Sequence, residues 1–341
     1  MERSFASDNY AGVHPEVFAA MERVNVGHQV AYGDDDVTAE LSELIREHFG
    51  PTAEVFPVFN GTGANVVAMQ SMAKPWEAVI CAASAHVNVD EGGAPEQVAG
   101  LKLWQVPTAD GKLTPELINT QAWGFGDVHR AQPGVMALTQ STELGTRYSI
   151  DELAAAVDCA KSHGMRVLVD GARLANAAAG LGVGFAAFTT DLGVDAVSFG
   201  GTKNGAMGAE AVVALNPDVA AAVPYLRKTD MQLASKMRFI SAQLIALLTD
   251  DLWLRNASHA NAMAQRLEAG ARAIDQVTVT RRAEANAVFA ILPPAVAERL
   301  MERFHFYTWN QETGEVRWMC AWDTTEADVD AFLAAIRAEL A

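Results

Sequence analysis

Short apolar runs alternate with alanine-rich stretches of helical period from about residue 50 to residue 215. The runs read "AEVFPVFN", "EAVICAA", "GVMALTQ", "MRVLVDGAR" and "VDAVSFGGTK", the last followed by "EAVVAL", and the stretches between them include "GTGANVVAMQSMA" and "SIDELAAAVDCAKSHG". Strands that are apolar throughout are typical of a parallel sheet covered on both faces by helices. We therefore predict an α/β domain whose ligand site lies at the carboxyl ends of its strands.

The pattern becomes mainly helical from about residue 225. The stretch "KMRFISAQLIALLTDDLWLRNASHANAMAQRLEAGARAI" predicts either one long helix or two helices broken near Asp250–Asp251. Strand-like "NAVFAIL" and "GEVRWMCAW" then alternate with the helical "PAVAERLMERF" and "EADVDAFLAAIRAEL". We predict a large domain over residues 1–245 and a smaller C-terminal α+β domain over residues 246–341.

Composition narrows the class of protein. The chain has 341 residues, of which 50% are hydrophobic and 20% charged, and its formal net charge is −17. Nucleic acid is a disfavoured partner, because its binding depends on clustered lysine and arginine. The N-terminus lacks a basic region followed by an apolar run, and no apolar segment has the length that spans a bilayer. We therefore expect a cytoplasmic protein without a membrane partner.

Neither the cysteines nor the acidic residues predict a metal site. Cys81, Cys159 and Cys320 are scattered without the CxxC spacing of a metal or redox motif. Residues 34–36 are three consecutive aspartates, but adjacent carboxylates point apart and no histidine cluster accompanies them. A solvated loop or a helix start near Thr38 is the better interpretation, and we expect no bound metal.

Polar residues follow four of the predicted strands. The segment Asn60–Gly63 ends one strand and opens a helix, His86 follows "VICAASA", Asp170 ends "MRVLVD", and Lys203 lies just past "AVSF". The carboxyl ends of parallel strands meet at one edge of the sheet, so these groups are expected to lie together. Four polar groups at one edge predict a functional site.

Each of these positions also has a structural interpretation. The Gly61 loop is either a phosphate-binding helix N-terminus or a turn with Thr62 as its N-cap. Asp170 needs a cation or strong donor, which is either Arg173 or a protonated cofactor nitrogen. Lys203 is a phosphate-binding charge, a surface lysine or a covalent nucleophile, and glycines on either side would let a bulky ligand approach. The presence of Asp170 one strand away favours the nucleophile.

Six short motifs stand in order along most of the chain. They read "FASDNYAGVHPEVFAAM", "AYGDDDVTAELSELIREHFG", "FNGTGAN", "SAHVNVDEGGAPE", "VDGARLANAA" and "FGGTKNGAMG". In this order they resemble the threonine aldolase group, which comprises low-specificity L-threonine and phenylserine aldolases. This group belongs to the fold-type I pyridoxal-phosphate enzymes and to the beta-eliminating lyase-like family. The resemblance implies pyridoxal 5'-phosphate as cofactor and a fold-type I architecture, with a mostly parallel central sheet, helices on both faces and a smaller C-terminal α+β domain.

The resemblance implies a role for each matching residue. Lys203 would form an aldimine with the cofactor aldehyde, Asp170 would pair with the pyridine N–H, and His86 would stack on the ring. The rest of the cofactor, including its phosphate and ring hydroxyl, would be bound by a wider set, namely Gly61, Thr62, Asn65, Arg173, Thr202 and either Arg238 or Lys236. Ser7 and Arg317 would hold the substrate α-carboxylate, for which a guanidinium is well shaped. Tyr32 would lie at a subunit interface of a homotetramer and face the neighbour's cofactor.

The implied reaction breaks the Cα–Cβ bond of L-threonine or a related β-hydroxy-α-amino acid, giving glycine and an aldehyde. A base must take the β-hydroxyl proton, and here the sequence departs from the family, because "QSTELGTRYS" carries Glu143 where the family has a histidine. Glu143 can act only through water or with a raised pKa, and an exposed loop position is the alternative. His86 is therefore the leading candidate for the base, and a preference for aryl serines stays open.

Three other functions compete with this interpretation. β-Elimination and transamination would use the same cofactor but break a different bond. A non-enzymatic carbohydrate- or nucleotide-binding module would use only the Gly61 loop. A yellow protein that borohydride bleaches, with the label left on Lys203, excludes the last of these, and product analysis separates the first two from an aldolase.

Overall fold

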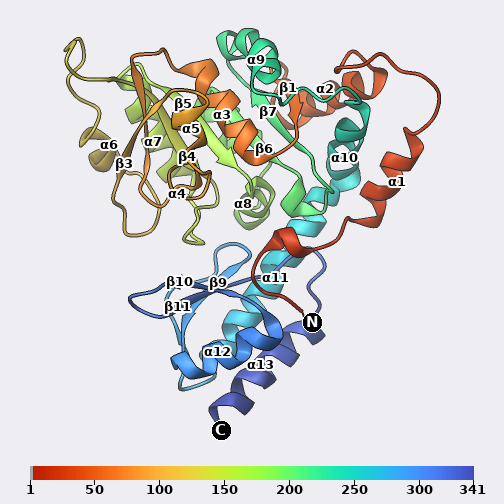
Figure 1. Ribbon diagram of the computed structural model, residues 1–341, viewed down its shortest axis with the longest axis vertical. Helices are drawn as coiled ribbons and strands as arrows, with labels where there is room; N and C mark the ends of the chain where they lie inside the picture. Colours follow the sequence, from red (N-terminus) through yellow and green to blue (C-terminus); the bar gives the residue numbers. More distant parts are fainter. Residues whose placement is uncertain (1–2) are drawn as a thin grey trace.

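A seven-stranded sheet forms the centre of the larger part of the computed structural model, which describes residues 3–341 (Figure 1). In spatial order its strands are β1 (Glu54–Val58), β7 (Glu210–Ala214), β6 (Ala196–Gly200), β5 (Arg166–Gly171), β4 (Gln132–Thr139), β2 (Glu77–Ala82) and β3 (Lys102–Val106). Strand β7 runs antiparallel to both of its neighbours, and the other pairings are parallel. The predicted mostly parallel α/β sheet is therefore confirmed.

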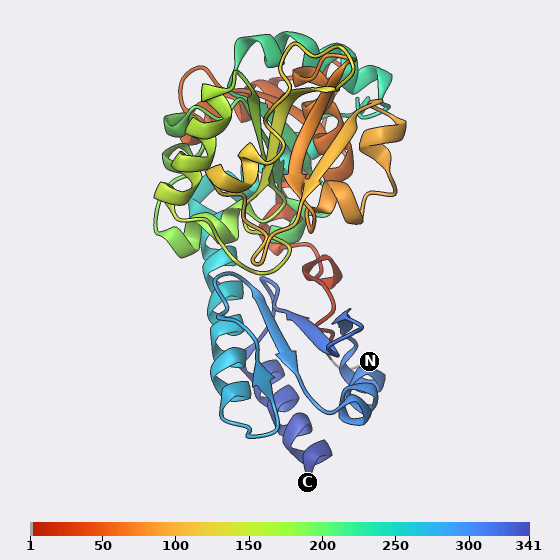
Figure 2. The ribbon, with the colours of Figure 1, turned by 90° about the vertical axis from the view of Figure 1, so that its left-hand side faces the viewer.

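Helices cover both faces of this sheet (Figure 2). They are α1 (Pro15–Arg23), α2 (Asp36–Phe49), α3 (Gly61–Met72), α4 (His86–Val89), α5 (Ala94–Gln97), α6 (Pro115–Asn119), α7 (Ile150–Ser162), α8 (Leu174–Leu181), α9 (Pro217–Thr229) and α10 (Arg238–Leu248). Because helices lie on both sides, strands such as β6 are buried along their whole length. This explains why the apolar runs in the sequence are continuous rather than alternating.

Local capping explains where several helices begin. Ser149 and Glu152 form a reciprocal capping box at the start of α7. Asp35 caps α2 by accepting a hydrogen bond of 2.8 Å from the backbone N–H of Thr38. The aspartate run at residues 34–36 is therefore a helix start, as the sequence predicts.

A four-stranded antiparallel sheet organises the C-terminal part of the chain. Its order is β10 (Tyr307–Asn310), β11 (Glu315–Met319), β9 (Ala287–Ile291) and β8 (Thr278–Val279), and the helices beside it are α11 (Leu252–Arg272), α12 (Pro294–Phe304) and α13 (Glu326–Leu340). Trp318, Phe332 and Leu267 share a buried cluster there with Phe5 from the N-terminal segment. The N-terminal segment therefore passes between the two sheets on its way to the larger part of the chain.

Helix α11 connects the two parts. Its first turns, with Trp253 and Ala257, pack in the large core, and its later turns, with Met263, pack in the C-terminal core. The break before it is the predicted one, since Asp250 and Asp251 adopt positive φ angles of 49° and 54° between α10 and α11. The division into residues 1–245 and 246–341 stays a prediction, and its boundary falls within α10.

None of the helices within residues 3–341 combines the length and the apolar character needed to cross a membrane.

Candidate functional site

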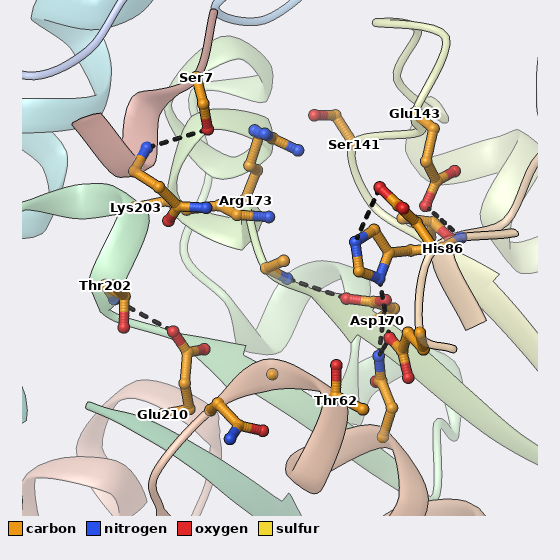
Figure 3. Close-up of a pocket in the computed structure, with 18 of the residues that line it drawn as sticks. Ser7, Thr62, His86, Ser141, Glu143, Asp170, Arg173, Thr202, Lys203 and Glu210 are labelled. Carbon is orange, nitrogen blue, oxygen red and sulfur yellow. Dashed lines mark hydrogen bonds and ion pairs between the residues drawn. The ribbon is translucent and has the colours of Figure 1, made fainter. Parts of the chain in front are cut away.

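A cavity of about 600 Å³ lies at the carboxyl ends of the parallel strands, where the N-terminal segment and strands β10 and β11 meet the large sheet. Most of the residues that the sequence selects line it, and many of them are labelled in Figure 3. They are Ser7, Gly61, Thr62, Asn65, His86, Glu143, Asp170, Arg173, Thr202, Lys203 and Arg317. Residues from five strand ends therefore converge on one site.

Asp170 lies near the end of β5, opposite Ser198 of β6, and is 4% exposed. Its Oδ2 atom accepts a hydrogen bond of 2.9 Å from Asn65 Nδ2, and its Oδ1 atom accepts one of 3.1 Å from the backbone N–H of Ala172. The hydroxyl of Ser198 donates to Oδ1 at 3.5 Å. The three groups that hydrogen-bond this carboxylate are all donors, and none of the cations in residues 3–341 forms an ion pair with it, so these donors stabilise the buried anion.

The interpretation that pairs Asp170 with Arg173 is wrong. Arg173 instead forms a two-point ion pair with Asp8, with Nε–Oδ2 and Nη2–Oδ1 distances of 2.7 and 2.9 Å. Burial alone would raise the pKa of Asp8, but the adjacent guanidinium outweighs burial and lowers it to about 2. Asn286 adds a hydrogen bond to the same carboxylate. Asp8 therefore neutralises Arg173 and ties the N-terminal segment to the start of α8.

Lys203 lies in the turn that follows β6, beside the cavity. Within the described chain its Nζ atom has no hydrogen-bond partner. Burial lowers the pKa of this amine, the nearby Arg173 lowers it further, and the carboxylates of Asp8, Asp170 and Glu210 act in the opposite direction. An amine with a depressed pKa is a better nucleophile than a solvated lysine.

The glycines before Lys203 are required by the protein rather than by a ligand. A Cβ atom on Gly200 would lie 2.7 Å from the carbonyl oxygen of Ala172, and one on Gly201 would lie 2.7 Å from that of Ala209. The expectation that these glycines clear a path for a bulky ligand is therefore wrong at these two positions. Their small size lets the turn carrying Lys203 pack against neighbouring backbone.

Glu210, the first residue of β7, is a cavity residue that the sequence analysis misses. Its Oε1 atom accepts a hydrogen bond of 3.2 Å from the backbone N–H of Thr202. Burial raises the pKa of this carboxyl to about 7, although the contact with Thr202 and the charge of Lys203 oppose the rise. In the sequence it is only the first letter of the apolar run "EAVVAL", which gives no signal of its position.

The Gly61 loop forms the first turn of α3. Asn60, not Thr62, is the N-cap, because its Oδ1 atom accepts a hydrogen bond of 2.7 Å from the N–H of Gly63. The backbone N–H groups of Gly61 and Thr62 have no acceptor among residues 3–341, and both residues line the cavity. Free N–H groups at a helix N-terminus bind phosphate or another anion.

His86 opens α4 between two carboxyl groups. Its backbone N–H donates to Glu143 Oε1 at 2.9 Å, and its ring Nδ1 atom lies 2.9 Å from Glu91 Oε1. The hydrogen bond with Glu91 raises the pKa of the imidazole, although burial acts against it. Glu91 lies within the motif "SAHVNVDEGGAPE", but the resemblance implies a role only for the histidine of that motif.

Glu143 lies in the loop after β4 and is directed into the site rather than into solvent. Burial raises its pKa to about 7, and repulsion from Asp170 adds to the rise. Its Oε2 atom is buried and has no hydrogen-bond partner in the described part of the protein. A carboxyl group of this kind can take or give a proton near neutral pH.

Arg317 on β11 brings a cation to the cavity from the C-terminal part. Its Cζ atom lies 4.4 Å from the centre of the Trp309 ring, and Nη2 makes a long hydrogen bond of 3.4 Å to the carbonyl of Ala6. Burial and the charge of Arg173 lower its pKa to about 10. No carboxylate among residues 3–341 forms an ion pair with it, and its buried Nε atom lacks a partner. This arrangement can accept a small carboxylate.

Three residues from the resemblance lie away from the cavity. Tyr32 is 50% exposed, with the ammonium of Lys228 5.3 Å from its ring centre. Arg238 donates to the carbonyl of Val26 at 3.2 Å, and Lys236 is exposed. Within residues 3–341, no group of three or more His, Cys, Asp or Glu side chains is arranged to hold a metal ion.

Comparisons with known proteins identify the family of the chain. The model of the beta-eliminating lyase family matches residues 4–293. A low-specificity L-threonine aldolase of a Pseudomonas species is 44% identical over 338 residues, covering 98% of this chain and 97% of that protein. Another, from Pseudomonas aeruginosa, is 45% identical over 324 residues, covering 94% and 93%. The structure of Leishmania major threonine aldolase superposes with a TM-score of 0.94 at 30% identity, covering 99% of this chain and 100% of that one. The chain therefore belongs to the beta-eliminating lyase family and, within it, is of the threonine aldolase type.

Proposed function

We propose that the protein is a pyridoxal 5'-phosphate-dependent aldolase that cleaves L-threonine and related β-hydroxy-α-amino acids to glycine and an aldehyde. The observation that carries this proposal is the convergence of Lys203, Asp170 and Arg317 on one cavity. Among residues 3–341, Lys203 has an amine without a hydrogen-bond partner, Asp170 has a buried carboxylate without a paired cation, and Arg317 has a guanidinium without a paired carboxylate. The relatives named low-specificity L-threonine aldolase support the choice of substrate.

The residues of the cavity fit the cofactor. Lys203 offers an amine with a depressed pKa, and Gly61 and Thr62 offer free N–H groups to a phosphate. Asp170 offers a carboxylate acceptor, and the side chain of His86 lies between it and Glu143 (Figure 3). When bound, pyridoxal phosphate supplies an electron-accepting ring whose aldehyde reacts with amino groups.

Four side chains of the cavity would have separate roles in binding the cofactor and the substrate. Lys203 Nζ would attach the cofactor and yield its place to the substrate amine, and Asp170 would hold the proton on the ring nitrogen. Arg317, with Ser7, would bind the α-carboxylate and fix the substrate's rotation about the bond from Cα to nitrogen. By fixing that rotation, Arg317 and Ser7 would select which bond at Cα is broken.

We propose Glu143 as the base that takes the β-hydroxyl proton, in place of His86, which the sequence analysis favours. The pKa of His86 is raised by Glu91, so this ring is held toward its protonated form and is better suited to donate a hydrogen bond. Glu143 has a pKa of about 7 and an Oε2 atom without a partner. A base works best when its pKa is close to the operating pH.

The products test the function directly. With L-threonine as substrate and added pyridoxal phosphate, we expect glycine and acetaldehyde in equal amounts. Ammonia with a keto acid would indicate elimination, and a protein that takes up no cofactor would contradict the proposal. Tyr10, Tyr307 and Trp309 also line the cavity, and these rings favour acceptance of L-phenylserine, so the kcat/KM for both substrates should be measured.

Replacing Arg317 tests the substrate clamp. Arg317→Ala should lower kcat/KM for L-threonine roughly 10- to 150-fold, mainly through KM, because about 1.5–3 kcal/mol of charge-assisted hydrogen bonding is lost. Arg317→Lys, which keeps the charge but not the two-point geometry, should lie between. Arg299→Ala is the matched control, since Arg299 pairs with Glu339 away from the cavity. An unchanged KM in Arg317→Ala would contradict the clamp.

Replacing Glu143 tests the base. Glu143 must be ionised to accept a proton, so activity should rise as the pH climbs through about 7. Glu143→Gln should lower kcat roughly 100-fold or more and abolish this rise. Steady-state kcat between pH 5.5 and 9 measures both effects, with Glu96→Gln, at an exposed position of α5, as control. A variant that keeps the acid limb of the wild-type profile would show that another group is the base.

We also propose that the protein is a homotetramer built from dimers, in which Tyr32 and Arg238 meet the neighbour's site. Support comes from exposed apolar side chains near them, namely Phe18, Val26, Val30 and Met231, which are 61–77% exposed. Light scattering that reports a monomer at micromolar concentration would contradict this.

A further inference from the structure

Glu91 is a deeply buried carboxylate beside the cavity that the proposed reaction leaves without a role. Its side chain is 0% exposed, whereas that of His86 is 37% exposed. A buried carboxylate is costly unless a cation or strong donors satisfy it. The described chain supplies two such groups, the His86 ring at 2.9 Å and Asn65 Nδ2 at 2.8 Å, and both meet the same oxygen, Oε1.

The contact with Glu91 determines the proton positions on His86. An ionised carboxylate only accepts hydrogen bonds, so Nδ1 must carry a proton to satisfy the 2.9 Å contact. Nε2 is then the nitrogen left for other partners. The nearest carboxylate to it is Asp90, at 3.9 Å and with a side chain that is 83% exposed.

Asn65 links Glu91 to the centre of the site. Its single NH₂ group donates to Glu91 Oε1 and to Asp170 Oδ2, at 2.8 and 2.9 Å, and the residue is 2% exposed. Both carboxylates are thereby fixed relative to one another from the first turns of α3. A movement of Glu91 would therefore disturb His86 and, through Asn65, Asp170.

We propose that Glu91 is a positioning residue, which fixes the proton on His86 Nδ1 and holds the imidazole at its place beside the cavity with Nε2 directed to bound groups. The loop supports this arrangement, because Gly92 and Gly93 adopt positive φ angles of 60° and 73° directly after Glu91. The expected effect of Glu91 on turnover rests on the function proposed above. The expected effect of Glu91 on the protonation of His86 is independent of that function.

Several charged groups face His86, and Glu91 has the largest effect among them. The hydrogen bond and the charge of Glu91 raise the pKa of the imidazole. The charge of Asp170 also raises it, whereas the charge of Lys203 lowers it. The groups around the ring are Glu91 and Asp90 after α4, Asp170 on β5, Glu143 after β4 and Lys203 after β6. Removing the charge of Glu91 should therefore lower the pKa of His86 more than removing that of Asp90.

Glu91→Gln and Asp90→Asn form a matched pair, because both remove one carboxylate charge beside the same histidine. The reactivity of His86 with diethyl pyrocarbonate, followed by mass spectrometry of its peptide as a function of pH, reports the neutral ring without turnover. In Glu91→Gln the half-maximal pH should fall by about one to two pH units, and in Asp90→Asn it should stay close to wild type. Equal shifts in the two variants would overturn the proposal.

Turnover gives an independent measurement. Glu91→Gln should lower kcat roughly 10- to 100-fold with little change in KM, as for carboxylates that orient metal-bound histidines. If Glu91 acts mainly through His86, adding Glu91→Gln to His86→Gln should cause a much smaller loss than Glu91→Gln causes alone, whereas fully additive losses would overturn the proposal. A wild-type protein without aldolase activity but with the expected difference in His86 reactivity would refute the proposed function alone.

Discussion

Lys203→Ala should fold normally and lose at least about 10⁴-fold in kcat, the order of loss seen when a covalent nucleophile is removed. The side chain lies in a turn at the wall of the cavity, and its Nζ atom makes no hydrogen bond in the described chain. Its removal therefore disturbs little of the fold, while no other amine lines the cavity within residues 3–341. The rate with L-threonine at saturating cofactor, together with the thermal unfolding midpoint, measures both expectations.

Two further lysine variants separate charge from covalent chemistry. Lys203→Arg keeps a cation among Asp8, Asp170 and Glu210 but has no nucleophilic amine, so it should be as inactive as the alanine variant. Lys102→Ala, on the exposed edge strand β3, should retain wild-type activity. Borohydride should fix the cofactor to the wild-type chain and to Lys102→Ala only. A tenth of the wild-type activity in Lys203→Ala would exclude covalent catalysis by this residue.

The continuous apolar runs are sufficient to predict the buried strands of the large sheet, because burial on both faces leaves a plain sequence signal. Strand β3 lacks this signal because it lies at the edge of the sheet, where the exposed side chains of Lys102 and Gln105 interrupt its apolar pattern. The apolar runs therefore do not predict it. Strands β8 and β10 are short and partly exposed, and they too lack a continuous apolar run.

The candidate site is predictable where a polar residue directly follows a buried strand, as for Asp170 and Lys203. Its partners are not, because they are distant in sequence: Asp8 meets Arg173 across 165 positions, and Asn65 meets Asp170 across 105. Without this information, Arg173 is one of two possible partners that the sequence offers for Asp170, the other being a protonated cofactor nitrogen. Glu91 and Glu210 contact residues that are closer in sequence, since His86 is five positions from Glu91 and Thr202 is eight positions from Glu210, but the sequence pattern does not show how the intervening loops fold.

Asp170→Asn should lower kcat roughly 100- to 1,000-fold, as expected when a preorganised charge at the reacting group is removed. The carboxylate would hold the proton on the cofactor ring nitrogen, and a neutral amide does not stabilise that charge. An amide also presents an NH₂ group to neighbours that all donate, namely Asn65, Ala172 and Ser198. At least one of these hydrogen bonds must be lost, so the variant should also unfold at a lower temperature.

The loss of activity must be separated from this loss of stability, and Asp195 provides the matched control. It is another aspartate, 3% exposed, but it lies at the amino end of β6, where it accepts a hydrogen bond from the backbone N–H of Val167 and pairs with Lys161. Asp195→Asn should destabilise the fold and leave kcat close to wild type, because it is at the opposite end of the strands from the cavity. Equal losses of kcat in the two variants would mean that Asp170 acts only on the fold. A loss confined to Asp170→Asn, measured well below both unfolding transitions, would assign its charge to the reaction.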